Sequence, residues 1–250
     1  MTDPVLSTVA DGIAHLELNR PEAANAFDMA LATALFEAVE WAAGEDQVRA
    51  VLLTGSGPRF CAGGDVASFL AGDDVETELR HLALAVDRAV RALEGLAKPV
   101  VAAVHGAVAG AGLPLMLSAD VVVADPGTKF VFAYPGIGLS PDAGASYLLP
   151  RAMGQQRALA FALTGEVLTA QGAQASGLVT QVAEGAADVA RGIAQQWAGG
   201  PATALGHARR LLRAGWQMER EEMGIEEART ISNLVNGAEA KALIAKFLSR

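Results

Sequence analysis

The sequence predicts an α/β core followed by a helical C-terminal region, and two observations support this fold class. Strand and helix signals alternate along most of the chain, whereas the last segments are helical with no strand between them. The chain has 250 residues, of which 52% are hydrophobic, which suits one large domain or one domain with an appendage. We expect the core over residues 1–195 and the helical region over residues 196–250.

The first elements follow from the periodicity of apolar side chains. Residues 12–19 alternate apolar and polar side chains, which is the pattern of a half-buried strand. Asp28 is a candidate N-cap for a helix whose apolar residues recur at every fourth position. Residues 50–54 form a short apolar strand, and the segment at residues 55–58, rich in glycine and ending in proline, terminates it.

The central and C-terminal elements are predicted in the same way. A helix is expected over residues 75–96 and a strand over residues 100–104. Two further strands, at residues 120–124 and 130–132, flank an Asp-Pro-Gly turn. The remaining predicted elements are helices at residues 145–153, 186–197, 202–216 and 219–247.

The charge balance and the cysteine count argue against several classes of protein. With 19 Lys and Arg against 28 Asp and Glu, the net charge is −9, so there is no general basic face for a nucleic acid. The single cysteine, Cys61, rules out an intrachain disulfide. The first residues lack the basic and apolar segments of a signal peptide, so we expect a cytoplasmic protein.

One segment has the length of a membrane span. Residues 99–119 contain no Asp, Glu, Lys or Arg, and such a run is long enough to cross a bilayer. Its glycine and proline residues, together with His105, are explained better by a buried strand, a glycine-rich turn and a buried helix. We therefore expect no membrane span.

Two glycine-rich turns, at residues 60–66 and 105–112, follow apolar strands. Small residues at such turns let a ligand or another backbone approach closely, and a helix that follows leaves N–H groups unpaired. Two N–H groups that converge from separate turns form an oxyanion hole, which stabilises negative charge on a carbonyl oxygen. The other interpretation, which the spacing alone favours, is that the glycines serve tight packing.

Asp142 lies in a third segment, residues 135–144, between a strand and a predicted helix. A carboxylate near a helix start is a good N-cap, whereas the same carboxylate beside a pocket is a candidate general base. The spacing alone favours the helix cap, and the general base stays open as the alternative. The four histidines show no paired spacing with acidic residues, so no metal site is expected.

Six segments in one order carry a family resemblance. They are LNRPEAANAF at residues 18–27, VLLTGSG at 51–57 with FCAGGD at 60–65, KPVVAAVHGAVAGAG at 98–112, SADVVVA at 118–124, GLSPDAG at 138–144 and LTG at 163–165. Together they resemble the enoyl-CoA hydratase/isomerase family, also called the crotonase superfamily, over nearly the whole chain. The resemblance favours the oxyanion-hole interpretation of the two turns.

The resemblance implies a crotonase-like spiral of strand–strand–helix units with C-terminal helices that form a homotrimer or a dimer of trimers. It implies an acyl-CoA thioester as substrate, with coenzyme A as part of that substrate, and no metal or redox cofactor. By position, the oxyanion donors are the N–H groups of Gly64 and Ala111, and cations such as Arg20 or Lys246 would hold the CoA phosphates. The residues expected near the adenine end of CoA are Ala24, Ala62, Asp65 and Val66.

The chain departs from the family pattern at positions that bear on the reaction. Where family hydratases carry two glutamates, this sequence has Pro114 and Tyr134, so ordinary hydration lacks both of its carboxylates. Asp142 stands where some isomerases of the family carry their working aspartate. The chlorobenzoyl-CoA dehalogenases also carry an aspartate there, but they pair it with a histidine whose matching position here is Asp87.

We therefore expect an isomerase in which Asp142 moves a proton through an enolate held by the oxyanion hole. Two alternatives remain open. One is a hydratase that uses Asp142 and a bound water, and the other is a catalytically silent acyl-CoA-binding homologue.

Overall fold

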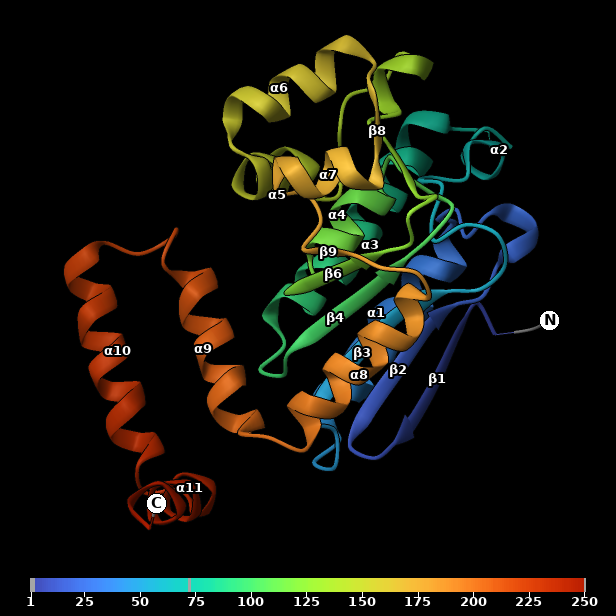
Figure 1. Cartoon of the computed structure of the whole chain (residues 1–250). Helices are drawn as coiled ribbons and strands as arrows, with labels where there is room; N and C mark the ends of the chain where they lie inside the picture. Colours follow the sequence, from blue (N-terminus) through green and yellow to red (C-terminus); the bar gives the residue numbers. More distant parts are fainter. Residues whose placement is uncertain (1–2, 72, 250) are drawn as a thin grey trace.

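A six-stranded sheet forms the centre of the computed structural model, which describes residues 3–71 and 73–249 (Figure 1). The strands lie in the order β1-β2-β3-β4-β6-β9. β1 and β2 are antiparallel, and each later neighbour pairs in parallel. The strands are β1 (Val5–Ala10), β2 (Ile13–Leu18), β3 (Ala50–Gly55), β4 (Val100–Val104), β6 (Val121–Ala124) and β9 (Gln181–Val182).

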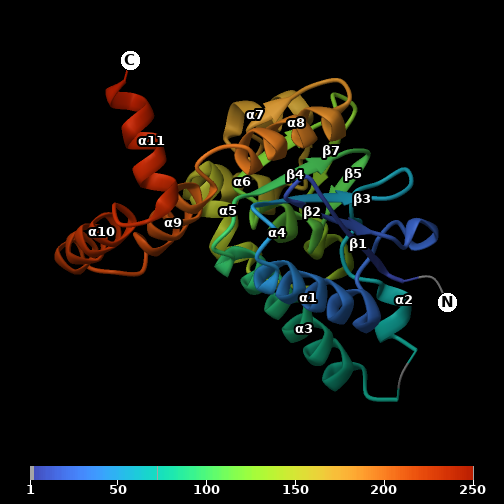
Figure 2. The same cartoon turned by 90° about the horizontal axis from the view of Figure 1, so that it is seen from below.

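Helices cover both faces of this sheet (Figures 1 and 2). α8 (Ala186–Ala198) lies against β3, β4 and β6, and the alanines on its buried face recur every four residues. These small side chains let the helix backbone come close to the strands. On the opposite face α1 (Met29–Gly44) packs against β1 and β2, and α3 (Val75–Gly95) packs against α1.

A second sheet has three short strands. β5 (Ala107–Ala109) is parallel to β7 (Lys129–Val131), which is antiparallel to β8 (Val167–Thr169). The glycine-rich segment at residues 105–112 therefore contains a strand that its sequence pattern did not reveal. The neighbouring short helices are η1 (Pro21–Ala23), α2 (Val66–Phe69), α4 (Gly112–Leu117), η2 (Tyr134–Ile137), α5 (Ala145–Met153), α6 (Gln155–Thr164) and α7 (Ala170–Ser176).

Local sequence signals predict several of these elements correctly. α1 begins after Asp28 because the Asp28 carboxylate accepts a hydrogen bond from the Leu31 N–H at 2.8 Å. α5 has the predicted bounds. The uncharged segment at residues 99–119 forms β4, β5 and α4. Within the described ranges no helix combines the length and the apolar character that crossing a bilayer requires.

The C-terminal helices extend away from the two sheets (Figures 1 and 2). The prediction of one helix over residues 219–247 is wrong, because Gly237 has an extended backbone that separates α10 (Arg220–Leu234) from α11 (Ala238–Leu248). α9 (Ala202–Ala214) connects them to the core. The expected boundary between residues 195 and 196 falls inside α8, and the division into two domains stays a prediction.

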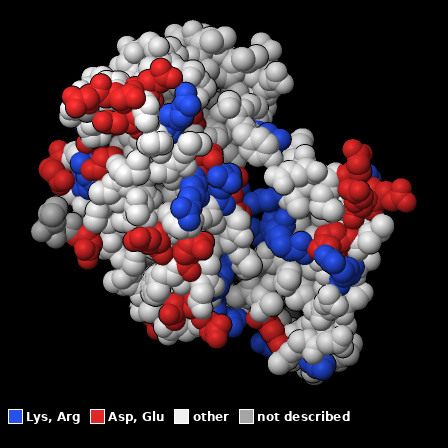
Figure 3. Space-filling view, turned by 180° about the vertical axis from the view of Figure 1, so that it is seen from behind, with Lys and Arg blue, Asp and Glu red and all other residues white. Residues whose placement is uncertain are grey.

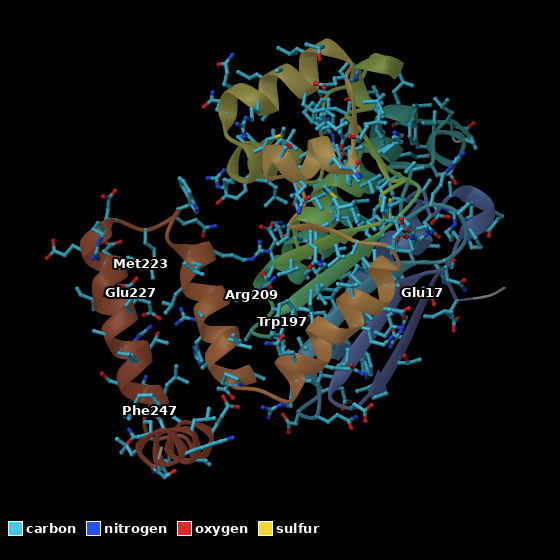
Figure 4. All side chains as sticks on the ribbon, in the orientation of Figure 1. Glu17, Trp197, Arg209, Met223, Glu227 and Phe247 are labelled. Atoms are coloured by element: carbon cyan, nitrogen blue, oxygen red, sulfur yellow. The ribbon has the colours of Figure 1, made fainter. Side chains whose placement is uncertain are left out.

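Arg209 joins α9 to the core. Its guanidinium donates hydrogen bonds to the backbone carbonyls of Leu93 and Glu94, at 2.8 and 2.6 Å, where α3 ends. The same group forms an ion pair with Asp120 at 2.6 Å. Figure 4 shows the side chain pointing from α9 toward the core, and Figure 3 shows Lys and Arg side chains gathered where the C-terminal helices meet the rest of the molecule. Because carbonyls at a helix end lack partners within the helix, the Arg209 cation stabilises this junction.

Candidate active site

The two glycine-rich turns lie at the same edge of the small sheet because their segments run in parallel. Cys61 and Val108 form a parallel bridge, in which the Ala109 N–H donates to the Cys61 carbonyl at 3.0 Å. Gly64 and Ala111 each lie three residues beyond this bridge. Since parallel segments advance by the same distance per residue, these two residues occupy matching positions at the edge.

Glycine is required where the two turns meet. Gly63 has a φ of +107°, and a Cβ atom there would lie 3.2 Å from the Ala109 carbonyl oxygen. A Cβ atom on Gly112 would lie 2.6 Å from the Cys61 carbonyl oxygen, closer than side chains allow. The glycines therefore serve tight packing, and this packing brings the two turns together.

The N–H groups of Gly64 and Ala111 are left available at this edge. Phe27 pairs with Gly64 by donating to the Gly63 carbonyl at 2.7 Å and accepting from the Asp65 N–H at 2.8 Å, so the Gly64 N–H faces the other side. Ala111 precedes the first residue of α4, where N–H groups have no partner within the helix. Neither N–H donates a hydrogen bond to another described residue. Two such donors suit a carbonyl oxygen on which charge develops.

Asp142 follows η2 and is held by a tyrosine. The Tyr134 hydroxyl donates a hydrogen bond to Asp142 Oδ1 at 2.9 Å. Because Tyr134 comes three residues after the end of β7, which is parallel to β5, it leaves the small sheet at the edge where Ala111 lies. Burial raises the pKa of the Asp142 carboxyl, and the nearby Asp87 charge adds to this rise, while the Tyr134 hydrogen bond opposes it.

The interpretation of Asp142 as a helix cap is wrong. The residue that precedes α5 is Gly144, which adopts a left-handed conformation with a φ of +82° and makes no side-chain cap. Asp142 contributes only its backbone carbonyl, which accepts a hydrogen bond from the Ala145 N–H at 2.9 Å. Its carboxylate is therefore turned to Tyr134 instead of the helix N-terminus.

Asp87 is a second carboxylate near this segment. It lies on α3, forms an ion pair with Arg91 at 2.7 Å, and its Oδ1 is 4.0 Å from the position of a Cβ atom on Gly144. Spacing gave no reason to select Asp87, because it is far from Asp142 in sequence and only the fold brings α3 against this turn. The family resemblance alone singled out the position.

The residues expected near coenzyme A gather around the first turn. The Ala62 N–H donates to the Ala24 carbonyl at 3.1 Å, and Asp65 caps α2, whose first residue is Val66. Val66 is exposed. These contacts place the four residues close together. Ala24 lies at the end of η1, and the other three belong to the glycine-rich turn at residues 60–66.

The two cations expected to hold the CoA phosphates, Arg20 and Lys246, lie in different parts of the molecule. The Arg20 guanidinium is already paired with Asp28 at 3.0 Å and with Asp65 at 3.2 Å. Lys246 belongs to α11, which lies on the far side of the molecule from η1 and α2 (Figures 1 and 2). That Arg20 or Lys246 holds the CoA phosphates stays a prediction.

The Cys61 thiol is a poor nucleophile at this site. Burial raises the pKa of the Cys61 thiol to about 12, so it stays protonated at neutral pH and fills space between the two turns. Within residues 3–71 and 73–249, no group of three or more His, Cys, Asp and Glu side chains is arranged to hold a metal ion.

Comparison with known proteins identifies the family that shares this fold. Residues 8–250 match the model of the enoyl-CoA hydratase/isomerase family, so the chain belongs to that family of acyl-CoA-processing enzymes. The resemblance inferred from the six motifs and the crotonase-like α/β fold are both confirmed.

Individual relatives include isomerases and hydratases. The 1,2-epoxyphenylacetyl-CoA isomerase of Escherichia coli is 40% identical over 212 residues, which cover 82% of this chain and 80% of the relative. The trans-2-decenoyl-(acyl-carrier-protein) isomerase of Streptococcus mutans is 39% identical over 183 residues, 72% of this chain and 69% of the relative. The crystal structure of an enoyl-CoA hydratase from Bacillus anthracis, 27% identical, superposes with a TM-score of 0.93 over 98% of this chain and 96% of that chain.

Proposed function

We propose that the protein is an enoyl-CoA isomerase that moves a carbon–carbon double bond by proton transfer. The observation that carries the proposal is the half-buried carboxylate of Asp142, which is held by Tyr134, a residue that leaves the small sheet at the edge of the Gly64 and Ala111 N–H groups. Pro114 and Tyr134 occupy the positions of the two hydratase glutamates, and one carboxylate suffices for an isomerase.

In the proposed reaction the thioester oxygen of a 3-enoyl-CoA accepts hydrogen bonds from Gly64 and Ala111. Asp142 removes a proton from the carbon between the thioester and the double bond, and the released electron pair forms a dienolate. The two N–H groups stabilise the charge on its oxygen. Asp142 then returns the proton to the far end of the dienolate, which gives the conjugated 2-enoyl-CoA and restores the carboxylate.

The electrostatic setting of Asp142 supports this role. Because burial raises the pKa of the carboxyl, the carboxylate is a stronger base than an exposed aspartate. A stronger base is what abstraction of a carbon-bound proton needs. Two relatives that are about 40% identical are named as isomerases, which supports an isomerase over a hydratase.

Incubation with a panel of 2-enoyl- and 3-enoyl-CoAs, followed by mass spectrometry, separates the candidate reactions. We expect a product of unchanged mass with a shifted double bond, and incorporation of deuterium when the reaction runs in heavy water. Gain of one water would establish a hydratase instead. Tight binding without any product would establish a silent acyl-CoA-binding protein.

Asp142→Asn tests the assignment of the base. We expect kcat to fall by about 100-fold or more, because general-base catalysis is lost, while the Kd for acyl-CoA changes little. Steady-state kinetics and isothermal titration calorimetry measure the two quantities. The matched control is Asp46→Asn, at an exposed aspartate in the turn after α1, which should keep wild-type kinetics. Wild-type turnover in Asp142→Asn would exclude the proposed base.

A further inference from the structure

We propose that Tyr134 is a positioning residue of the reaction, which holds the Asp142 carboxylate in the orientation from which it removes the substrate proton. This inference rests on the proposed role of Asp142. It assigns a task to a residue that stands where the family hydratases carry a carboxylate.

The hydrogen bond to Tyr134 distinguishes the two oxygens of the carboxylate. The Tyr134 hydroxyl donates to Oδ1 at 2.9 Å, and among the described residues no other side chain donates to Asp142. With Oδ1 bound, rotation of the carboxylate is restricted and Oδ2 is left as the oxygen that accepts a proton. A hydrogen bond to an ionised group is among the stronger ones in proteins, so the phenol can fix this orientation.

The Tyr134 ring is itself immobilised by aromatic packing. Only 8% of the residue is exposed. Its ring lies 5.1 Å from the Phe132 ring in a tilted arrangement, and Phe132 in turn packs edge-on against Phe161 at 6.2 Å. Since Phe132 directly follows β7, the phenol is anchored to the same small sheet that carries Ala111.

The charged and titratable groups around Asp142 come from three elements. Tyr134 faces it from η2, Asp87 with its partner Arg91 from α3, and Cys61 lies near Tyr134 in the first turn. Burial and Asp87 raise the pKa of Asp142, and the Tyr134 hydrogen bond acts in the opposite direction. Burial and the Asp142 charge raise the pKa of Tyr134, so the phenol keeps its proton and remains a donor.

Tyr134→Phe removes the hydroxyl and keeps the ring packing. We expect kcat to fall by about ten- to hundredfold, which corresponds to the loss of a hydrogen bond to a charged group, and KM to change less than twofold. Without the hydrogen bond the pKa of Asp142 rises, so the acidic limb of the kcat–pH profile should move to higher pH. A residue that only supported the fold would leave this limb in place.

Two further variants sharpen the test. Tyr147→Phe is the matched control, because it alters the only other tyrosine of the sequence, whose hydroxyl lies on α5 and accepts from Gln217 at 3.1 Å. It should leave kcat and the acidic limb unchanged. Replacing Tyr134 by 3-fluorotyrosine keeps the ring and provides a more acidic donor, so the acidic limb should move to lower pH.

The outcomes separate this inference from the proposed function. If Asp142→Asn is inactive while Tyr134→Phe retains wild-type kcat and an unmoved acidic limb, the positioning role is overturned and the base assignment stands. If Asp142→Asn is fully active, the proposed function itself fails. If circular dichroism shows that Tyr134→Phe does not fold, the 3-fluorotyrosine variant becomes the test. An acidic limb of its kcat–pH profile that stays at the wild-type pH would overturn the inference.

Discussion

Asp142 combines a chemical role with a cost to stability. Its carboxyl has a raised pKa in the folded protein, which means that the native state disfavours the ionised form relative to the unfolded chain. The cost is absent at pH values below the pKa of an unfolded aspartate, about 3.9, and it develops as the pH rises through the folded-state pKa. A residue that serves function is thus a weak point in the stability of the fold.

Asp142→Asn should therefore stabilise the protein at neutral pH. The asparagine side chain is uncharged and can still accept the Tyr134 hydrogen bond, so the burial cost disappears while the contact remains. We expect a higher urea midpoint than wild type at pH 7 and a difference that shrinks toward pH 3. Equal midpoints at pH 7 would contradict a raised pKa at Asp142, and Asp46→Asn reports the effect of removing an exposed charge.

The hydrogen bond between Tyr134 and Asp142 could not be predicted from the sequence. The sequence identified both residues, Asp142 as a candidate base and Tyr134 as a departure from the family. Their hydrogen bond depends on the path of η2 and on the left-handed Gly144, which together turn the carboxylate back toward the sheet. Residue spacing alone favoured a helix cap at Asp142 over a general base.

Helix α9 packs against the core through a glycine. A Cβ atom on Gly206 would lie only 1.9 Å from the Ala97 carbonyl oxygen, so the helix backbone and the segment after α3 are in direct contact. Arg209 lies three residues further along α9, nearly one turn, and makes its contacts at the same junction. A displacement of the helix at Gly206 would therefore also disturb the Arg209 contacts.

Gly206→Ala should destabilise the protein by about 1–3 kcal/mol, the usual range for overpacking a close contact. The matched control is Gly192→Ala within α8, where nothing lies within 4 Å of an added Cβ atom. The control should stabilise the protein by about 0.5–1 kcal/mol, since alanine is the better helix former. Urea denaturation of both variants measures the difference, and equal effects would show that α9 does not pack as described.

Elements with strong local signals were predicted well, and those defined by their partners were not. Asp28 identifies the start of α1, and the turn residues before Ala145 identify the start of α5. β5 has only three residues, and its hydrogen bonds to the first turn and to β7 are what make it a strand. No periodicity can develop over so few residues. The matching positions of Gly64 and Ala111 therefore became visible only in the fold.

The C-terminal helices expose more apolar surface than a solvated helix normally does. A groove of about 490 Å³ also lies between α9 and α10. Large apolar side chains that are at least two-thirds exposed on this region are Leu212, Trp216, Ile225, Ile231, Phe247 and Leu248. We propose that further copies of the chain cover this surface, in a trimer or a dimer of trimers.

Sedimentation equilibrium at micromolar concentration tests this assembly. We expect three or six times the mass of one chain. Ile231→Glu, which places a charge on the exposed apolar surface of α10, should shift the equilibrium toward the monomer by tenfold or more, since burying an unpaired charge is unfavourable. Asn233→Glu is the matched control, at an exposed polar position of the same helix. A monomeric wild-type protein would contradict the proposal.

The Arg209 junction has a consequence for how this chain tolerates sequence change. Its partners at Leu93, Glu94, Leu96 and Ser118 are backbone carbonyls, which every amino acid supplies. Substitutions at these four positions preserve the acceptors as long as α3 and α4 keep their ends. An insertion or deletion that changes where either helix ends moves the acceptors themselves. The attachment of the C-terminal helices through Arg209 thus depends on where helices in the core end, and the ion pair with Asp120 and the hydrogen bonds of Arg213 to the Ser118 and Ala119 carbonyls add to it.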